Sequence, residues 1–421
     1  DPFNEIDAPS WDPQTLGNMA AHIYGSMAAV DPEAVWLQMG WLFYADPAHW
    51  THENIRSFLR AVPQDRLIML DYYCEFTEIW KQTQEFYGQP YIWCYLGNFG
   101  GNTMMSGNFR TVSSRIDDAL ANGGDNLIGM GSTLEGFGVN MFMYEYILER
   151  AWDTGMSDDE WIEVLADRRL GYVDEGVRKA WRTLCDEVYT EHSKTGHATL
   201  TCAHPALEGN WHWTTKPSTN YPTETLWNVW ETVLSGESDR DTYGYDVVDV
   251  GRQVLGDHFM AVRDQFTEAY KSGDLPLMQE KAAMMLDIID DMDRLVACHP
   301  EFSLKDWVDM ARSFGETPQQ KDYYETNART LVSVWGDSYH LSDYASRAWA
   351  GMLSSFYKVR WEMFLKEVMD SFKAGVPFDA KAFDARIWEF ENAWAKSSHE
   401  IDYPEPGDPV ATAKEIFAKY R

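Results

Sequence analysis

Four uninterrupted apolar runs, separated by amphipathic segments, constrain the fold of the first 150 residues more than any other feature of this sequence. The runs cover residues 34–43, 66–73, 91–99 and 126–132. Apolar side chains at helical spacing precede and separate them, at residues 14–29, 52–62, near 77–87, 109–121 and 139–152. Continuously apolar strands that alternate with helices predict a parallel sheet that is covered on both faces.

The spacing of these runs favours one kind of parallel sheet. The runs begin at residues 34, 66, 91 and 126, and such spacing fits strand–helix units. Four such units make half of a (β/α)₈ barrel of the TIM type. A doubly wound sheet is the alternative. No GxGxxG or GxxxxGK[ST] motif follows a strand, so the sequence gives nucleotide binding no support.

The pattern changes at about residue 157. Ser157 opens a capping box that ends at Glu160, and Thr317 precedes a proline at a second helix start. Helical patterns recur at 224–235, 247–272, 276–297, 303–313, 318–334, 342–374, 379–397 and 410–420. We therefore expect an α/β fold plus an all-α fold: half of a (β/α)₈ barrel at 1–156 and an α-helical domain at 157–421.

Charge and cysteine content narrow the classes of partner and cofactor. Asp and Glu number 67 against 35 Lys and Arg, which gives a net charge of −32 and disfavours nucleic acid and anionic membrane surfaces. No apolar stretch is long enough for a membrane span. The five cysteines form no CxxC pair. The spacing of His192, His197, His204 and His212 fits no helical ligand pair, so we expect no metal.

The candidates for chemistry are acidic and aromatic residues at the predicted carboxyl ends of strands, where parallel barrels carry their active sites. The acidic ones are Glu5, Asp71, Glu75 and Glu135, and the aromatic ones are Trp41, Tyr72, Tyr73 and Trp93. Two carboxylates among aromatic platforms are what a glycoside-hydrolysing site needs. Each has an ordinary structural alternative. Asp71 could be a hydrogen-bond acceptor, Glu135 a helix cap, and Cys94 part of the core or of a pocket wall.

Several aromatic-rich blocks, in order along the chain, carry a family resemblance. They are Asp1-Pro2-Phe3-Asn4-Glu5, Trp36-Leu37, Gly40 to Phe43, Gly88 to Cys94, Asn98 to Asn102, Leu134-Glu135-Gly136, Leu331 to Gly336, Asp343-Tyr344-Ala345, Tyr357 with Arg360-Trp361, and Lys414 to Tyr420. This collinear set resembles the α-N-acetylglucosaminidases of glycoside hydrolase family 89. The resemblance covers nearly the whole chain.

The resemblance implies an activity and two catalytic residues. Members of this family remove terminal α-linked N-acetylglucosamine with retention, and they use two glutamates without a metal or cofactor. Glu5, in the Asn-Glu motif, matches the general acid/base, and Glu135 matches the nucleophile. Residues implied to line the sugar pocket or lie near it are Asn4, Trp41, Trp93, Cys94, Asn98, Trp335, Leu341 and Tyr344.

The resemblance also implies that a full-length member has more barrel than this chain. The chain then corresponds to the second half of the barrel and the helical domain. We expect these 421 residues alone to be inactive, aggregation-prone or both, with Glu5 on a frayed N-terminus and an unpaired edge on the first strand. One departure is Leu134, which stands where the family usually has proline.

The expected function is that of a retaining exo-glycosidase that acts on glycans ending in α-linked N-acetylglucosamine. The net charge favours a neutral mucin-type glycan over heparan sulfate. The alternatives are a barrel glycosidase of another specificity and a truncated, non-catalytic fragment that binds carbohydrate or acts as a scaffold. The resemblance favours an extracellular or secreted protein, and the oligomeric state stays open.

Overall fold

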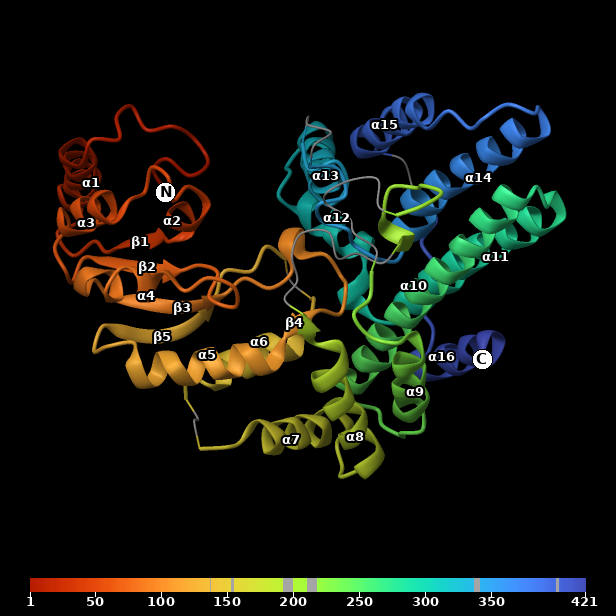
Figure 1. Cartoon of the computed structure of the whole chain (residues 1–421), viewed down its shortest axis with the longest axis horizontal. Helices are drawn as coiled ribbons and strands as arrows, with labels where there is room; N and C mark the ends of the chain where they lie inside the picture. Colours follow the sequence, from red (N-terminus) through yellow and green to blue (C-terminus); the bar gives the residue numbers. More distant parts are fainter. Residues whose placement is uncertain (137, 153–154, 192–199, 210–217, 337–340, 399–400) are drawn as a thin grey trace. The chain divides into compact units, whose positions relative to one another are not determined.

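The computed structural model describes the chain except residues 137, 153–154, 192–199, 210–217, 337–340 and 399–400 (Figure 1). It divides into two compact units. The sheet unit comprises residues 1–97, 108–135 and 141–158. The helical unit comprises residues 98–107, 136–140 and 159–421. The two units are described separately below.

The core of the sheet unit is a four-stranded parallel sheet. Its strands are β1 (Trp36–Met39), β2 (Leu67–Asp71), β3 (Tyr91–Tyr95) and β5 (Leu127–Ser132), in the order β1-β2-β3-β5 (Figure 1). Trp36 pairs with Leu67, Met69 with Tyr91, and Trp93 with Met130. Strand order follows chain order across these four strands, as it does in a (β/α)₈ barrel.

Helices connect these strands and cover one face of the sheet. They are α1 (Pro13–Ala28), α2 (Trp41–Ala45), α3 (His52–Arg60), α4 (Ile79–Gln82), α5 (Phe109–Asn122) and α6 (Met141–Glu149), with a 3-10 turn at Glu85–Gly88. Asp12, Thr51 and Asn108 cap α1, α3 and α5 by accepting a backbone N–H, which satisfies the first turn of each helix.

The prediction of one strand over residues 34–43 was too long. The strand ends at Met39, and Trp41 begins the short helix α2. The chain turns at Gly40, where a β-carbon would lie 2.9 Å from the carbonyl oxygen of Leu70. This close approach to β2 needs glycine, and it directs Trp41 away from the strand at its carboxyl end.

One face of the sheet is more open than we expected. Trp36, Met69 and Tyr91 are buried, whereas Leu37 and Ile128 are 56% and 52% exposed. Because side chains alternate along a strand, Leu37 lies on the opposite face from Trp36, whereas Ile128 lies where the register between β3 and β5 is irregular. Among the strands that the structure describes, β1 pairs only with β2, so its other edge is unpaired as predicted.

The helical unit contains ten helices in its described residues. They are α7 (Asp158–Leu170, whose first residue belongs to the sheet unit), α8 (Glu175–Thr183), α9 (Thr223–Leu234), α10 (Asp241–Ser272), α11 (Leu275–Val296), α12 (Leu304–Ser313), α13 (Pro318–Val332), α14 (Lys358–Lys373), α15 (Ala380–Lys396) and α16 (Pro409–Tyr420). Short helical turns lie at Leu184–Val188, Leu200–Cys202, Pro300–Phe302 and Leu353–Tyr357. Two-residue strands, β4 (Gly107–Asn108) and β6 (Thr190–Glu191), form a second sheet.

Long helices form the core of the helical unit. Helices α10 and α11 pack along each other (Figure 1). Trp230 of α9 is buried and donates its indole N–H to the carbonyl of Val247 in α10, at 3.0 Å. Gly251 makes this contact possible, because a β-carbon there would overlap the Trp230 ring.

One predicted helix begins later than its pattern indicated. Residues 342–374 were expected to be helical, but the helical backbone begins at Leu353. Asp343 and Ser346 have positive φ angles of 63° and 44°, which are incompatible with a right-handed helix. Buried polar contacts, described below, stabilise this turn against the local helical preference.

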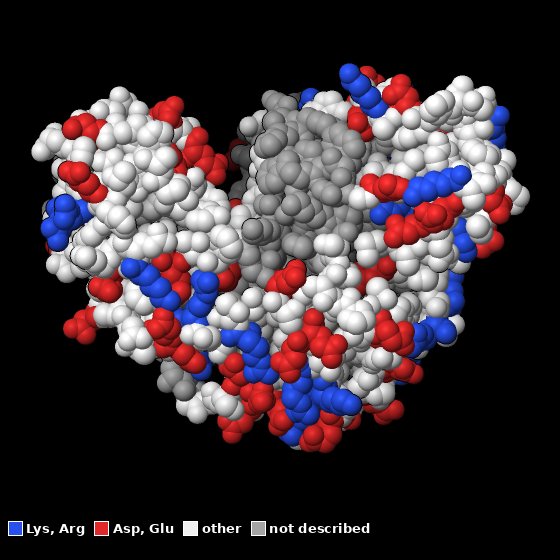
Figure 2. Space-filling view, in the orientation of Figure 1, with Lys and Arg blue, Asp and Glu red and all other residues white. Residues whose placement is uncertain are grey.

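The surface agrees with the strongly acidic composition. On the face drawn in Figure 2, the basic side chains of described residues lie among acidic ones. Within the described ranges, no helix combines the length and the apolar character that crossing a bilayer requires.

Candidate active site

The first candidate carboxylate lies at the carboxyl end of β1. Trp41 donates its indole N–H to Glu5 Oε1 at 3.0 Å. Glu5 is exposed and has a left-handed backbone, with a φ of 55°. The tryptophan hydrogen bond therefore fixes the orientation of a carboxylate that solvent can reach.

The segment before Glu5 is anchored, contrary to the expected frayed N-terminus. Asp1 Oδ1 accepts hydrogen bonds from Gln38 Nε2 at 2.6 Å and from the Met39 backbone N–H at 3.1 Å. These contacts hold the chain against edge strand β1. The sequence analysis missed Asp1, because nothing in the local pattern shows that its carboxylate meets a strand edge 38 residues away. Asn4 Oδ1 is buried and has no hydrogen-bond partner among the described residues.

Aromatic rings surround Trp41. The Trp41 ring centroid lies 5.0 Å from Tyr44, 5.6 Å from Tyr72 and 5.9 Å from Tyr73. Trp41 and Tyr72 are only partly buried. The carboxyl ends of β1 and β2 thus carry an accessible aromatic surface of the kind that packs against a sugar ring.

The second candidate carboxylate, Glu135, follows β5. Thr133 fixes this strand end, because its backbone N–H donates to the Tyr95 carbonyl at 3.0 Å and its hydroxyl donates to the Tyr72 carbonyl at 2.7 Å. Burial, together with the charges of Glu135, Cys94 and Glu5, raises the pKa of the Tyr72 hydroxyl to about 12. The charges of both carboxylates therefore act on the same tyrosine.

Trp93 and Cys94 are neighbours on β3 and point to opposite faces of the sheet. Trp93 is fully buried and donates its indole N–H to Glu78 Oε1 at 3.2 Å. Cys94 lies on the other face, and it contributes to the raised pKa of Tyr72. Burial raises the pKa of the Cys94 thiol. A protonated, buried thiol fits a pocket wall and not a nucleophile.

The other two acidic candidates, Asp71 and Glu75, accept hydrogen bonds from backbone N–H groups. Asp71 accepts from the N–H groups of Ile79 and Trp80 at 3.1 and 3.0 Å. Glu75 accepts from Leu96 and Gly97, the latter at 2.7 Å. Burial raises the pKa of both carboxyls to about 7, although these hydrogen bonds oppose it. Both residues are buried loop anchors, which leaves Glu5 and Glu135 as the accessible pair.

In the helical unit, Trp335 and Tyr344 come together although nine positions separate them. Their ring centroids lie 4.8 Å apart at 68°, an edge-to-face contact. Both rings are partly exposed, as is Leu341. Trp335 follows the end of α13, as expected, but Tyr344 lies in a turn and does not open a helix. Its N–H donates to the Leu341 carbonyl at 3.2 Å.

Asn98 is buried and stabilises its own loop. Its amide N–H₂ donates to the carbonyls of Asn102 and Met104, both at 2.8 Å, and its oxygen accepts from Asn140 at 2.6 Å. These bonds use both ends of the side-chain amide.

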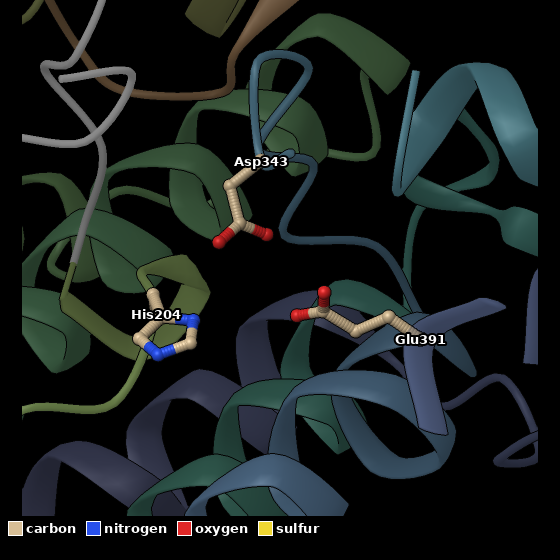
Figure 3. A group of neighbouring side chains, drawn as sticks. All are labelled: His204, Asp343 and Glu391. Carbon is tan, nitrogen blue, oxygen red and sulfur yellow. The ribbon is translucent and has the colours of Figure 1, made fainter. Parts of the chain in front are cut away.

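His204, Asp343 and Glu391 offer three ligand atoms within 4.8 Å of one another, and all three are buried (Figure 3). Arg360 Nη1, however, donates to both oxygens of Asp343 at 2.8 and 3.0 Å and to Glu391 Oε1 at 2.7 Å. The guanidinium already supplies the positive charge that these carboxylates need, so the donor set does not fit a metal ion. The other three histidines considered as ligands, His192, His197 and His212, lie outside the described residues.

Comparison with known proteins gives a consistent match. Residues 1–154 match the α-N-acetylglucosaminidase (NAGLU) tim-barrel domain, and residues 161–419 match the α-N-acetylglucosaminidase (NAGLU) C-terminal domain. The chain is 31% identical to human α-N-acetylglucosaminidase over 429 aligned positions, which include the whole of this chain.

Solved structures agree with the fold. A family 89 glycoside hydrolase from Clostridium perfringens, in complex with PUGNAc, matches the whole chain with a TM-score of 0.86 at 24% identity. A variant of the C. perfringens enzyme CpGH89, in complex with its substrate GlcNAc-α-1,4-galactose, matches 99% of the chain with a TM-score of 0.86 at 22% identity. The chain spans 57% of the human relative and 48% of each bacterial chain. The predicted half-barrel followed by a helical domain is confirmed.

Proposed function

Because this chain belongs to the α-N-acetylglucosaminidase family, we propose that the protein removes terminal α-linked N-acetylglucosamine from glycans. The observation that carries the proposal is that two accessible carboxylates, Glu5 and Glu135, lie at the carboxyl edge of a parallel sheet, where the charges of both raise the pKa of Tyr72. The human relative is an α-N-acetylglucosaminidase, and the substrate of the bacterial one is GlcNAc-α-1,4-galactose. Both names support the same bond as the target.

We propose a retaining mechanism with two displacements. Glu5 gives its proton to the glycosidic oxygen while Glu135 attacks the anomeric carbon, so the aglycone leaves and a glycosyl–enzyme ester forms. Glu5 then takes a proton from water, which attacks the anomeric carbon and releases Glu135. The Trp41 N–H bond to Glu5 Oε1 leaves the second carboxyl oxygen to carry the proton.

Sugar binding is proposed to involve aromatic faces and one amide. Trp41 and Tyr72 offer partly exposed rings beside the two carboxylates, and Asn4 Oδ1 can accept a bond from a sugar hydroxyl. Trp335, Leu341 and Tyr344 are proposed to contact the sugar, as the family resemblance implies. Trp93 and Asn98 are left out of the contacting set, because the amide and indole groups of these buried side chains already have protein partners. Cys94 is proposed as part of the pocket wall.

The remaining expectations belong to the same proposal. We propose a catalytic barrel half at residues 1–156, a helical domain at 157–421, and secretion or an extracellular location. The net charge of −32 favours a neutral, mucin-type glycan over sulfated heparan chains, because like charges repel.

The test is turnover of a chromogenic α-N-acetylglucosaminide, with the β-anomer as the specificity control. It compares the 421-residue chain with the complete product of its gene. Glu5→Gln and Glu135→Gln should each lower turnover by about a hundredfold or more. Glu75→Gln is the matched control, because Glu75 is a buried loop anchor at the same sheet edge. Sugar binding without turnover by either protein would favour a non-catalytic carbohydrate-binding fragment, and equal turnover of both anomers would favour another specificity.

A further inference from the structure

We propose that a buried ion-pair cluster positions the Trp335–Tyr344 pair for sugar binding. In this cluster, called the Arg360 junction below, the guanidinium of Arg360 binds the carboxylates of Asp343 and Glu391. The sugar-binding part of this inference rests on the proposed function. Figure 3 shows Asp343 and Glu391 approaching one centre from separate segments of the helical unit, with His204 beside them. Arg360, Asp343 and Glu391 are positioning residues here, since the pair itself would contact the sugar.

The guanidinium of Arg360 joins four segments of the chain. Arg360 lies in α14 and is fully buried. Its Nη1 contacts Asp343 and Glu391, and its Nη2 donates to the carbonyls of Cys202 and Ala203 at 3.1 and 3.0 Å. A planar fork with fixed donors suits such a junction, and a lysine ammonium could not make all of these bonds.

The turn that the guanidinium holds is directly linked to both aromatic residues. The Asp343 N–H donates to the Ser333 carbonyl at 3.0 Å, just after the end of α13 and two residues before Trp335. Asp343 also immediately precedes Tyr344. The contact between Asp343 and Arg360 therefore acts on the positions of both rings.

The backbone of this turn needs external support. Asp343 and Trp335 both have left-handed φ angles, 63° and 62°, a conformation that side-chain-bearing residues keep only when their surroundings impose it. Ser342 donates its hydroxyl to Glu391 Oε2 at 3.3 Å, which adds a second link to α15. Loss of these polar contacts should let the turn relax.

The other side of the turn is fixed by close packing. A β-carbon at Gly100 would overlap the Tyr344 carbonyl, and the Thr103 backbone N–H donates to the Ser346 carbonyl at 3.3 Å. Tyr344 is thus held between the 98–107 loop and the Arg360 junction. Its side chain is partly exposed and contacts the Trp335 ring.

The two carboxylates at the junction are not equivalent. Both carboxylate oxygens of Asp343 accept a hydrogen bond from Arg360 Nη1, whereas only one oxygen of Glu391 does. Burial raises the pKa of Glu391 to about 7, with the charge of Arg360 opposing this rise and the charge of Asp343 supporting it. A glutamine at 391 therefore imitates the protonated side chain, whereas an asparagine at 343 replaces one of the two oxygens that Arg360 binds with an amide N–H₂ group.

The experiment compares Asp343→Asn, Glu391→Gln and a matched control, Asp246→Asn. Asp246 forms a buried pair with Arg169 of the same unit, with contacts of 2.6 and 2.9 Å, in α10. The readouts are Tm, amide hydrogen exchange at residues 333–336 and 341–347, and the Kd of N-acetylglucosamine measured by NMR titration. A turnover assay adds KM and kcat where the protein is active.

Asp343→Asn should speed exchange in both segments by about tenfold or more and weaken N-acetylglucosamine binding by about tenfold, raising KM more than it lowers kcat. Glu391→Gln should change either quantity less than about threefold. Asp246→Asn should lower Tm without changing exchange at 341–347 or the Kd. Added Zn²⁺ or Ca²⁺, or a chelator, should leave the Tm of the parent protein unchanged.

The inference is overturned if Asp343→Asn lowers Tm but leaves exchange at 341–347 and the Kd unchanged, or if Asp246→Asn changes both equally. A metal-dependent rise in Tm would overturn the assignment of the centre to Arg360. If the parent protein neither binds nor cleaves the sugar, the proposed function and the sugar-binding part both fail. The exchange measurement still decides whether the junction holds the turn.

Discussion

Four carboxylates near one edge of the sheet have different roles because their neighbours differ. Asp71 and Glu75 are enclosed and accept backbone N–H groups, so they stabilise loops. Glu5 is exposed to solvent and accepts the indole N–H of Trp41. The charges of Glu5 and Glu135 both raise the pKa of Tyr72. The sequence pattern placed all four at this edge, and only the family resemblance separated Glu5 and Glu135 from the other two. Burial and hydrogen-bond partners depend on residues from several strands.

The roles of the two glutamates can be distinguished by azide rescue. With an activated aryl α-N-acetylglucosaminide, Glu5→Ala should still form the glycosyl–enzyme, and azide should then yield the α-glycosyl azide. Glu135→Ala lacks the nucleophile, so azide should attack directly and yield the β-glycosyl azide. NMR of the azide products checks this, and the opposite pairing of variant and anomer would reverse the assignment.

Substitution of glycine by alanine should have opposite effects on stability at two positions, Gly101 and Gly25. A β-carbon at Gly101 would overlap the Arg347 guanidinium and lie 2.8 Å from the Gly136 Cα, at a φ of 67°. Gly25, inside α1, has nothing within 4 Å. Gly101→Ala should therefore cost about 1–3 kcal/mol of unfolding free energy.

Gly25→Ala should instead add about 0.5–1 kcal/mol of stability, because alanine loses less backbone entropy in a helix. Chemical denaturation measures both changes. Equal effects of the two substitutions would contradict the close contact at Gly101.

At the scale of elements, local patterns predicted most helices and all four main strands. They failed where a distant residue overrides local preference. Residues 34–43 split at Gly40 because the chain approaches the Leu70 carbonyl of β2. Residues 342–352 do not form a helix because Asp343 binds Arg360 in a left-handed turn. Neither contact leaves a signal in the neighbouring sequence.

The start of α13 after Thr317 could be predicted from the sequence because the residues that cap the helix are neighbours in the chain. Thr317 accepts the Gln320 N–H at 3.2 Å, and the Gln320 side chain accepts the Thr317 N–H at 3.0 Å. Thr317→Ala should lower the unfolding free energy by about 0.5–2 kcal/mol. Thermal denaturation measures this, with Thr317→Ser as the control that keeps the cap. No difference between alanine and serine would contradict the capping box.

At the scale of the whole molecule, buried acids determine how stability depends on pH. Burial raises the pKa of Asp71, Glu75 and Asp257 to about 7 and that of Asp293 to about 6. The folded chain therefore binds protons between about pH 4 and pH 7 that the unfolded chain has lost. Stability is greatest at the acid end of this window and falls as pH rises through it.

Burial lowers the pKa of two histidines, the buried His204 and the half-buried His258, and they oppose this trend below about pH 6.5. These four acids and Glu391, whose pKa is also raised to about 7, outnumber them, and self-repulsion of a chain with a net charge of −32 acts in the same direction as the acids. Urea denaturation should give a larger unfolding free energy at pH 5 than at pH 7.5. Asp257→Asn should reduce the difference, and greater stability at pH 7.5 would refute this explanation.

The sequence also predicted a half-barrel with an open edge, and the structure adds two apolar side chains on its strands, Leu37 and Ile128, that are half exposed. Exposed apolar sheet surface favours association. Inactivity or aggregation of these 421 residues alone therefore remains a prediction. Light scattering of the chain beside the complete gene product tests it, and a monomeric, equally active chain would contradict it.

The central claim is that Glu5 and Glu135 perform a retaining cleavage of α-linked N-acetylglucosamine. The most direct measurement is time-resolved proton NMR of the reaction, which identifies the anomer of N-acetylglucosamine released before mutarotation. The two-displacement mechanism predicts the α-anomer first, with β-anomer appearing only as the free sugar equilibrates. Initial release of the β-anomer, or of a sugar other than N-acetylglucosamine, would contradict the claim.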